Sequence, residues 1–305
     1  MKKKIAILAG GFSKEREISL QTGREVQRHL KSKYKTILLD TNGDLINKLR
    51  KIKPDIVFNA LHGRFGEDGY IQSILEKEKL KYTHSGVISS FLAIDKFLSK
   101  KIFKENNILT PKCIKYSFKI NFKKKNLLKF IKKKFKFPVV IKPLNEGSSV
   151  GVYICGENNF YKNLKKLKIF KEILIEEFIP GQEIQAAILG NKKIGAIELI
   201  PKRNFYDYKA KYSKSAKTKH IMPANLSKKN YKIVNDLALK AHKILKCRGV
   251  SRSDFRFFKN KFYLLELNTQ PGMTSLSLVP EIANYNKINF FNLLDSIVKD
   301  ASINK

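Results

Sequence analysis

The sequence has few cysteines and no long hydrophobic run, and each absence excludes a class of protein. Only three cysteines occur among 305 residues. Cys113, Cys155 and Cys247 are far apart in the sequence, and they form neither a CxxC pair nor an even-numbered disulfide framework. We therefore expect free thiols in a reducing, cytoplasmic compartment. No apolar run approaches the about 18 residues that a membrane-spanning helix needs, so we expect no membrane partner.

Acidic residues and arginines are also scarce. The chain carries 62 Lys+Arg against 26 Asp+Glu, a net charge of +36, and only nine of the basic residues are arginines. Such a charge could attract nucleic acid. Arginine, however, supplies the bidentate contacts that nucleic-acid readers favour. Because the lysines are spread along the whole chain, we interpret them as solvated surface and expect no nucleic-acid partner.

The first residues imitate a signal peptide, with three lysines before a short apolar core. The core ends after Ala9, and charged residues follow at once. A buried parallel strand that opens a βα unit explains the pattern better. Gly10 and Gly11 then form a tight turn, and Ser13 is a candidate N-cap of the next helix. The turn does not read GxGxxG, so it is only a weak phosphate-binding signal.

The following segments predict a small doubly wound α/β domain over residues 1 to about 90. Strands are expected at 36–39 and 55–60, then a glycine-rich loop at 61–69. Further along, 119–136 is the most basic segment and is expected to be helical. Its apolar residues recur at i, i+4 and i+8, which gives one apolar face. RNA or membrane binding could use such a helix, but the globular flanking segments favour packing on a sheet.

A cluster of oxygen-bearing side chains lies at the end of two apolar segments joined by a 259–261 turn. Glu266 and Asn268 are spaced i and i+2, so they share one face of a strand, and the hairpin can bring Asp254 beside them. Hard oxygen ligands suit Mg²⁺, which also binds substrate phosphates. The alternative is that these are ordinary polar residues at strand ends.

Two segments are suited to a nucleotide. The strand FPVVIK at 137–142 ends in Lys142 and runs into a Gly/Ser loop whose N–H groups can point at phosphate oxygens. In the strand at 172–179, either Glu176 or Glu177 could lie in an adenine pocket, and Glu183 could reach a ribose. The polar, aromatic-rich segment 203–223 has the length of a lid or binding loop, with Lys211 and Tyr212 as its candidates for chemistry.

Six motifs, in this order, resemble those of the D-alanine–D-alanine ligases of the ATP-grasp superfamily. The resemblance covers nearly the whole chain. The motifs are GGFSKEREISLQTG at 10–23, ALHGRFGEDGYIQ at 60–72, FPVVIKPLNEGSSVGV at 137–152, LIEEFIPGQE at 174–183, FYDYKAKY at 205–212, and RSDF at 252–255 with LELNTQPGMTSLSLVP at 265–280. Departures from the family pattern are His84 and Lys209, and neither position is a site residue in the family.

The resemblance implies an α/β and α+β fold, in which a doubly wound α/β domain precedes a two-part ATP-grasp fold. The expected divisions are 1–95, 96–180 and 181–305, with a lid loop at 203–223. It also implies the site residues. The expected catalytic residues are Glu15, Ser148, Tyr212, Arg252 and Ser277; the ATP-binding residues Lys96, Lys142, Glu176, Glu177, Phe178, Ile179, Glu183 and Lys211; the substrate-binding residues His62, Gly272 and Leu278; and the metal ligands Asp254, Glu266 and Asn268.

The activity that the resemblance implies is ATP-dependent ligation of two D-alanines through a D-alanyl phosphate, for peptidoglycan precursor synthesis. ATP and two Mg²⁺ or Mn²⁺ ions would be the cofactors, D-alanine the substrate and a homodimer the usual assembly. A related ligase that joins D-alanine to D-lactate or D-serine is the alternative. Tyrosine at position 212 favours the dipeptide-forming enzyme.

Overall fold

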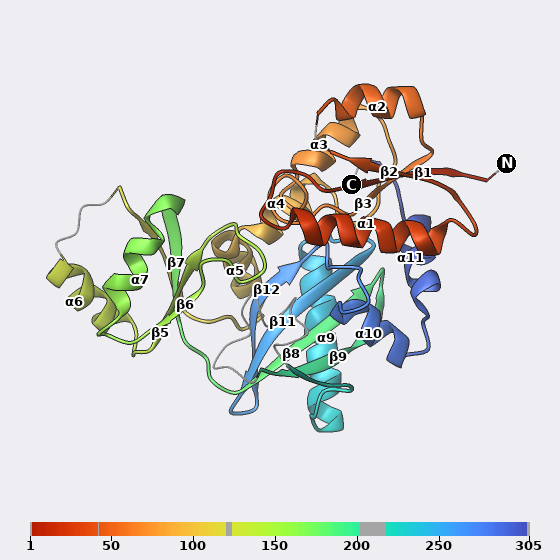
Figure 1. Cartoon of the computed structure of the whole chain (residues 1–305). Helices are drawn as coiled ribbons and strands as arrows, with labels where there is room; N and C mark the ends of the chain where they lie inside the picture. The colour runs from red at the N-terminus through yellow and green to blue at the C-terminus, as the bar shows by residue number, and fades with distance from the viewer. Residues whose placement is uncertain (1, 42, 120–123, 202–217, 304–305) are drawn as a thin grey trace.

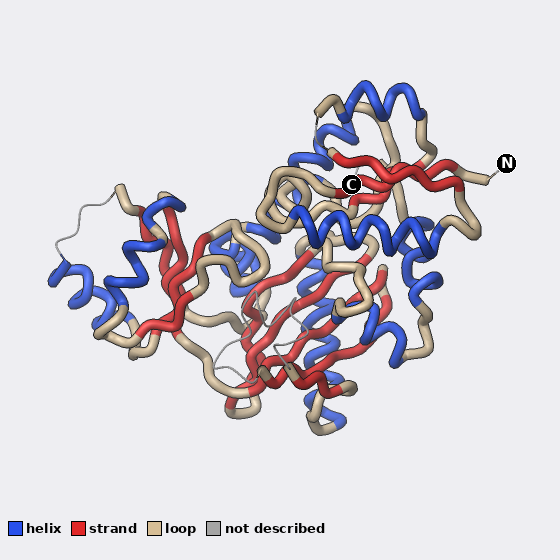
Figure 2. Tube along the Cα trace, in the orientation of Figure 1, coloured by secondary structure: helices blue, strands red, loops and turns tan. Residues whose placement is uncertain are grey.

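The computed structural model describes residues 2–41, 43–119, 124–201 and 218–303, and its strands form three sheets (Figure 1). Figure 2 shows them as separate groups, with the first sheet above the third and the second to one side. In the described parts of the chain, no helix is long and apolar enough to cross a membrane.

The first sheet is parallel, in the order β2-β1-β3, and carries helices on both faces. Alternate residues of its central strand enter two different cores: Ile5 and Ile7 pack with Val26 of the first helix, whereas Ala6 and Leu8 pack on the opposite face. This is the doubly wound arrangement. Its elements are β1 (Lys4–Ala9), α1 (Arg16–Leu30), β2 (Lys35–Asp40), α2 (Leu45–Ile52), β3 (Ile56–Asn59) and α3 (Tyr70–Lys77), followed by α4 (Val87–Ile94) and α5 (Lys96–Glu105).

The second sheet is antiparallel, in the order β4-β7-β5-β6. Helix α6 packs its apolar face on this sheet: Leu127, Ile131 and Phe135 are buried in one core, while Lys132 to Lys134 are exposed. That burial accounts for the amphipathic pattern as a packed helix. The elements are β4 (Cys113–Ser117), α6 (Lys124–Lys134), β5 (Val139–Pro143), β6 (Tyr153–Cys155), α7 (Phe160–Lys166), η1 (Lys168–Phe170) and β7 (Glu172–Glu177).

The third sheet is antiparallel, in the order β10-β9-β8-β11-β12. Helix α9 buries one side against it through Val234, Ala238 and Ala241. The elements are β8 (Gln182–Leu189), β9 (Lys192–Ile200), β10 (Lys219–Ile221), α9 (Lys228–Ile244), β11 (Val250–Phe258), β12 (Lys261–Asn268), α10 (Leu278–Tyr285) and α11 (Phe290–Lys299).

Packing joins the three units more closely than their order in the chain suggests. Helix α5 buries Phe103 in one core with Phe262 and Leu264 of the third sheet. Helix α11, near the end of the chain, packs on α1 of the first unit. The expected divisions at 95 and 180 therefore stay predictions, since elements on both sides of each division share cores.

One local expectation is wrong. Helix α1 begins at Arg16, so Glu15 rather than Ser13 occupies the N-cap position, and its side chain makes no capping hydrogen bond. The Ser13 hydroxyl instead donates to the carbonyl of His62 at 2.7 Å and accepts from the Glu15 N–H at 3.1 Å. The Ser13 hydroxyl therefore bonds to the loop at His62 and does not cap the helix.

Candidate active site

Two adjoining cavities lie where the three units meet. The predicted residues that line the first are Glu15, His62, Lys96, Ser148, Arg252, Glu266, Asn268, Gly272, Ser277 and Leu278. Those that line the second are Lys96, Lys142, Glu176, Glu177, Phe178, Ile179, Glu183, Asp254 and Glu266. Lys96, Glu146 and Glu266 belong to both, so the cavities meet at these three side chains. Lys211 and Tyr212 lie outside the described residues.

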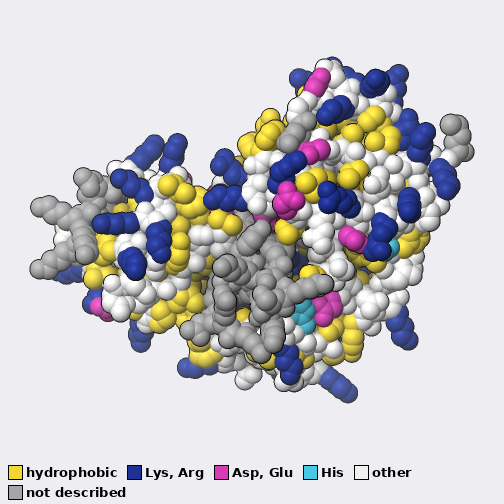
Figure 3. All heavy atoms as spheres, in the orientation of Figure 1, with side chains coloured by type: hydrophobic (Ala, Val, Ile, Leu, Met, Phe, Trp, Pro, Cys, Tyr) yellow, Lys and Arg dark blue, Asp and Glu magenta, His cyan; other side chains and the backbone are white. Residues whose placement is uncertain are grey.

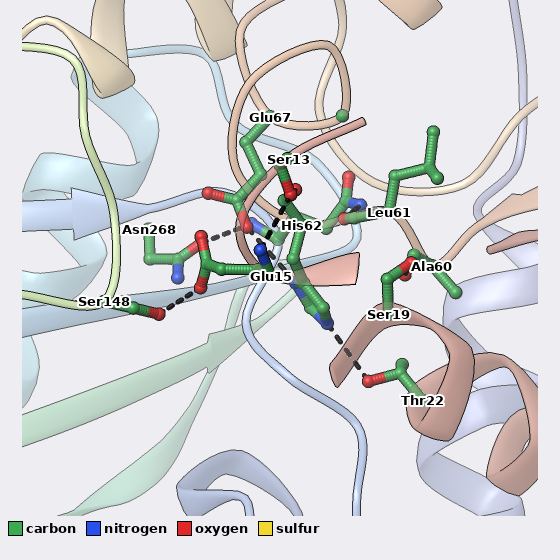
Figure 4. Close-up of polar contacts among 12 residues, drawn as sticks. Ser13, Glu15, Ser19, Thr22, Ala60, Leu61, His62, Glu67, Ser148 and Asn268 are labelled. Carbon is green, nitrogen blue, oxygen red and sulfur yellow. Dashed lines mark hydrogen bonds and ion pairs between the residues drawn. The ribbon is translucent and has the colours of Figure 1, made fainter. Parts of the chain in front are cut away.

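A hydrogen bond across the first cavity joins the start of α1 to the loop after β5. The Ser148 hydroxyl donates to the Glu15 carboxylate, and the two side chains point toward each other in Figure 4. Gly63 lies against the same carboxylate: it has φ +70, and a Cβ there would lie 2.9 Å from Glu15 Oε2. Ser148 itself has φ 47, a left-handed conformation that costs energy in a non-glycine residue. The loop is thus held in a strained shape at this bond.

His62 is buried and hydrogen-bonded on both ring nitrogens. Its Nδ1 lies 3.2 Å from Glu67 Oε1 and its Nε2 lies 3.0 Å from Thr22 Oγ1 (Figure 4). Since an ionised carboxylate can only accept, Nδ1 is the nitrogen that carries the proton toward Glu67. The histidine is therefore both a satisfied buried residue and part of the cavity wall.

The β11–β12 hairpin carries four polar side chains on one face. Asp254 lies directly opposite Glu266, and Arg252 lies opposite Asn268. Arg252 forms a bidentate ion pair with Asp254, at 2.7 and 3.0 Å, and Lys96 Nζ lies 3.2 Å from Glu266 Oε2. The hairpin prediction is confirmed, and both carboxylates are charge-balanced by a neighbouring cation.

The second cavity lies between the second and third sheets and has a buried carboxylate in its wall. Glu176 is 2% exposed, and its two oxygens lie 2.6 Å from Lys142 Nζ and 3.1 Å from Lys100 Nζ. Burial alone would raise the pKa of Glu176, but the two ammonium groups outweigh it and lower that pKa. Glu177 also lines this cavity, but its carboxylate accepts from the Lys112 N–H at 2.8 Å.

Several residues of the site were not predicted. Glu67 orients His62; the Glu146 carbonyl accepts from Lys96 Nζ at 2.7 Å; and Arg256 pairs with Glu183 at 3.0 Å. Gln270 bonds to Asn59 and to the Leu61 carbonyl, which ties the loop after β12 to the first unit. Glu67 and Glu146 stand inside recognised motifs, but only tertiary contacts distinguish them from their neighbours.

Comparison with known proteins decides the family. The family model "D-ala D-ala ligase C-terminus" matches residues 106–299. The D-alanine–D-alanine ligase of Pelagibacter ubique (strain HTCC1062) is 61% identical over 306 residues, which cover 100% of both chains. The chain belongs to the D-alanine–D-alanine ligase family. The ligase of Wolbachia pipientis wMel is 47% identical over 97% of this chain and 94% of the relative.

Solved D-alanine–D-alanine ligases share the fold. The Bacillus anthracis enzyme, in a crystal structure complexed with ATP, superposes with a TM-score of 0.85 at 33% identity, over 98% of this chain and 97% of that chain. The Coxiella burnetii enzyme gives 0.82 at 25% identity, over 98% and 93%. The predicted family and the predicted ATP-grasp fold are both confirmed.

Proposed function

We propose that this protein joins two D-alanine molecules into D-alanyl-D-alanine, with conversion of ATP to ADP and phosphate, for the synthesis of peptidoglycan precursors. The observation that carries the proposal is the meeting of the two cavities at Lys96, Glu146 and Glu266. A nucleotide in the second cavity would present its terminal phosphate there, beside an amino acid in the first. The relatives named above carry this activity in their names.

The second cavity suits ATP. Glu176 can accept a hydrogen bond from the adenine amino group, and the backbone of Glu177 to Ile179 can meet the base edge. Glu183, at the far side, can bond the ribose. Lys142 and Lys96 line the same cavity and would balance phosphate charge. Lys211 remains the predicted contact to the terminal phosphate.

The hairpin face suits two Mg²⁺ or Mn²⁺ ions. Asp254, Glu266 and Asn268 offer only oxygen donors, and two of them are carboxylates directly opposite each other. Two carboxylates and one amide leave ligand positions for phosphate oxygens, which is how Mg²⁺ is usually held in such sites. When bound, the ions would offset charge on the transferring phosphoryl group. Arg252 and Lys96 balance the same carboxylates in the structure described here.

The first cavity suits two D-alanines. A carboxylate oxygen of the first D-alanine attacks the terminal phosphorus of ATP and ADP leaves, which forms an acyl phosphate. The amine of the second D-alanine then attacks the carbonyl carbon, and phosphate leaves. Arg252 can stabilise the oxyanion between these events. Glu15, Ser148 and Tyr212 would bind the first D-alanine, and His62, Gly272, Ser277 and Leu278 would shape the two amino-acid positions.

Phosphate release from ATP with a panel of amino and hydroxy acids tests the proposal. We expect turnover with D-alanine, background rates with L-alanine and a dipeptide as the product. Equal rates with both enantiomers, or none with either, would refute it. A product that contains D-lactate or D-serine, when these are supplied with D-alanine, would identify the related ligase instead. Homodimer assembly and a cytoplasmic location remain predictions.

A further inference from the structure

Lys100 is a buried lysine behind the nucleotide cavity, and no motif singled it out. It is 2% exposed, and its ammonium lies 3.1 Å from Glu176 Oε2 and 3.5 Å from the carbonyl oxygen of Leu264. It does not line the cavity, whereas Glu176 does. Lys100 lies one helical turn after Lys96 on α5. This helix therefore places Lys96 at the phosphate end of the nucleotide cavity and Lys100 behind the position proposed for the base.

Burying an ammonium is costly unless it is paired, so the Glu176 carboxylate beside Lys100 indicates what this lysine does. Burial lowers the pKa of Lys100, and the Glu176 carboxylate opposes that change. Glu176 in turn has two cations, Lys100 and Lys142. Under the proposed function, the Lys142 ammonium would also interact with the nucleotide phosphates, which weakens its pairing with Glu176. Lys100 would then be the partner that keeps the buried Glu176 ionised while nucleotide is bound.

The protonation state of Glu176 determines whether it can bind a donor or an acceptor group on the edge of the base. An ionised carboxylate only accepts, whereas a protonated one also donates. Oε2 of Glu176 is buried and faces Lys100, whereas Oε1 lies 2.6 Å from Lys142 Nζ, which lines the cavity. Oε1 is therefore the oxygen that can accept from an exocyclic amine once Lys142 also contacts phosphate.

We infer that Lys100 is a positioning residue that holds Glu176 as a hydrogen-bond acceptor and thereby makes the cavity select a 6-amino purine over a 6-oxo purine. Adenine offers an amine at this position, and hypoxanthine offers a carbonyl oxygen, which an ionised carboxylate repels. The inference deepens the proposed function and rests on Glu176 facing the base.

The test compares ATP with inosine triphosphate as substrates for D-alanine ligation. Lys100→Met removes the charge and keeps an apolar stem of similar length; Lys101→Met is the matched control, because Lys101 is the next residue and is exposed. We expect Lys100→Met to raise KM for ATP by about 10- to 100-fold at pH 7, with a smaller change in kcat. The preference for ATP over inosine triphosphate should fall by a similar factor. Lys101→Met should match the wild type.

A purely structural role would not give a pH-dependent effect. In Lys100→Met, Glu176 would take up a proton, so KM for ATP should fall again as pH rises and the proton is lost. Lys100→Met/Glu176→Gln removes both members of the pair, so no Glu176 charge is left without Lys100, and it covers the case in which the single variant fails to fold. This double variant should lack the ATP preference at every pH.

The inference is overturned if Lys100→Met keeps the wild-type ratio of ATP to inosine triphosphate turnover, or if the double variant still prefers ATP as strongly as the wild type. Failure of the proposed function shows separately, since the wild type would then have no D-alanine-dependent turnover of ATP.

Discussion

Asp254 is one of the two carboxylates of the proposed metal site. It is 6% exposed, lies opposite Glu266 and accepts from Nε and Nη2 of the Arg252 guanidinium. Asp254→Asn keeps the volume and removes the charge, so we expect turnover to fall by about 100-fold or more while the fold is kept. The measurement is phosphate release as a function of Mg²⁺ concentration, with circular dichroism as the check on folding.

Asp236→Asn is the matched control for that change. Asp236 forms an exposed ion pair with Lys193, and neither residue lines either of the two cavities. Exposed ion pairs contribute little to stability. The control variant should leave turnover and its Mg²⁺ dependence unchanged. Near-normal turnover of Asp254→Asn at limiting Mg²⁺ would remove Asp254 from the metal site.

The sequence alone could predict site residues whose spacing fixes the face of a strand on which they lie. Glu266 and Asn268 could be placed on one face because i and i+2 point the same way in a strand. Lys100 could not be found, since its local surroundings differ little from those of exposed Lys101, and only the fold places Glu176 beside it. The prediction of Ser13 as a cap was wrong because its hydroxyl makes a tertiary hydrogen bond to the His62 carbonyl, which the local sequence does not show.

The contact between α1 and α11 joins elements from opposite ends of the chain. Asp295 of α11 accepts from Tyr34 at 2.6 Å and from Lys33 at 2.8 Å, both just after α1, and Lys299 lies 2.8 Å away. Burial would raise the pKa of Asp295, but these donors outweigh it and lower the pKa to about 2. The carboxylate therefore stabilises the packing of the first unit against the C-terminal helices.

Asp295→Asn tests this contact through its dependence on pH. An unfolded aspartate has a pKa of about 3.9. The folded pKa is lower, so the stabilisation is fully present above about pH 4 and is lost as pH falls toward about 2. It amounts to about 2.5 kcal/mol at pH 7. We expect the variant to lose about that much unfolding free energy at pH 7 and clearly less at pH 3, as measured by urea denaturation.

An unchanged difference between wild type and variant at the two pH values would contradict the linkage. Asp236→Asn again serves as the control and should differ little from wild type at either pH.

Helices and strands with a regular apolar pattern could be predicted from the sequence, but their partners could not. The spacing of Leu127, Ile131 and Phe135 predicted the buried face of α6, and the β11–β12 hairpin was placed at its turn. Nothing local showed that Phe103 of α5 packs on the third sheet, or that α11 returns to α1. Such pairings depend on the whole chain.

Across the whole molecule, lysine and acidic residues are distributed differently. Lys and Arg side chains are scattered over the face seen in Figure 3 and do not gather into one patch on it. Several of the few acidic residues line the cavities instead, among them Glu15, Glu176 and Glu266. A net charge of +36 would favour the approach of an anion such as ATP, and more so at low salt. Charge and fold are thus both compatible with one nucleotide-dependent site between the units.

We propose that the two cavities act as one site, in which ATP activates a D-alanine carboxylate before the second D-alanine attacks. The direct measurement uses D-alanine with ¹⁸O at both carboxylate oxygens and mass spectrometry of the phosphate released. The oxygen that attacks phosphorus leaves with the phosphate, so the account predicts one heavy oxygen in each phosphate for each dipeptide formed. Phosphate without heavy oxygen, or heavy oxygen in AMP with release of pyrophosphate, would contradict it.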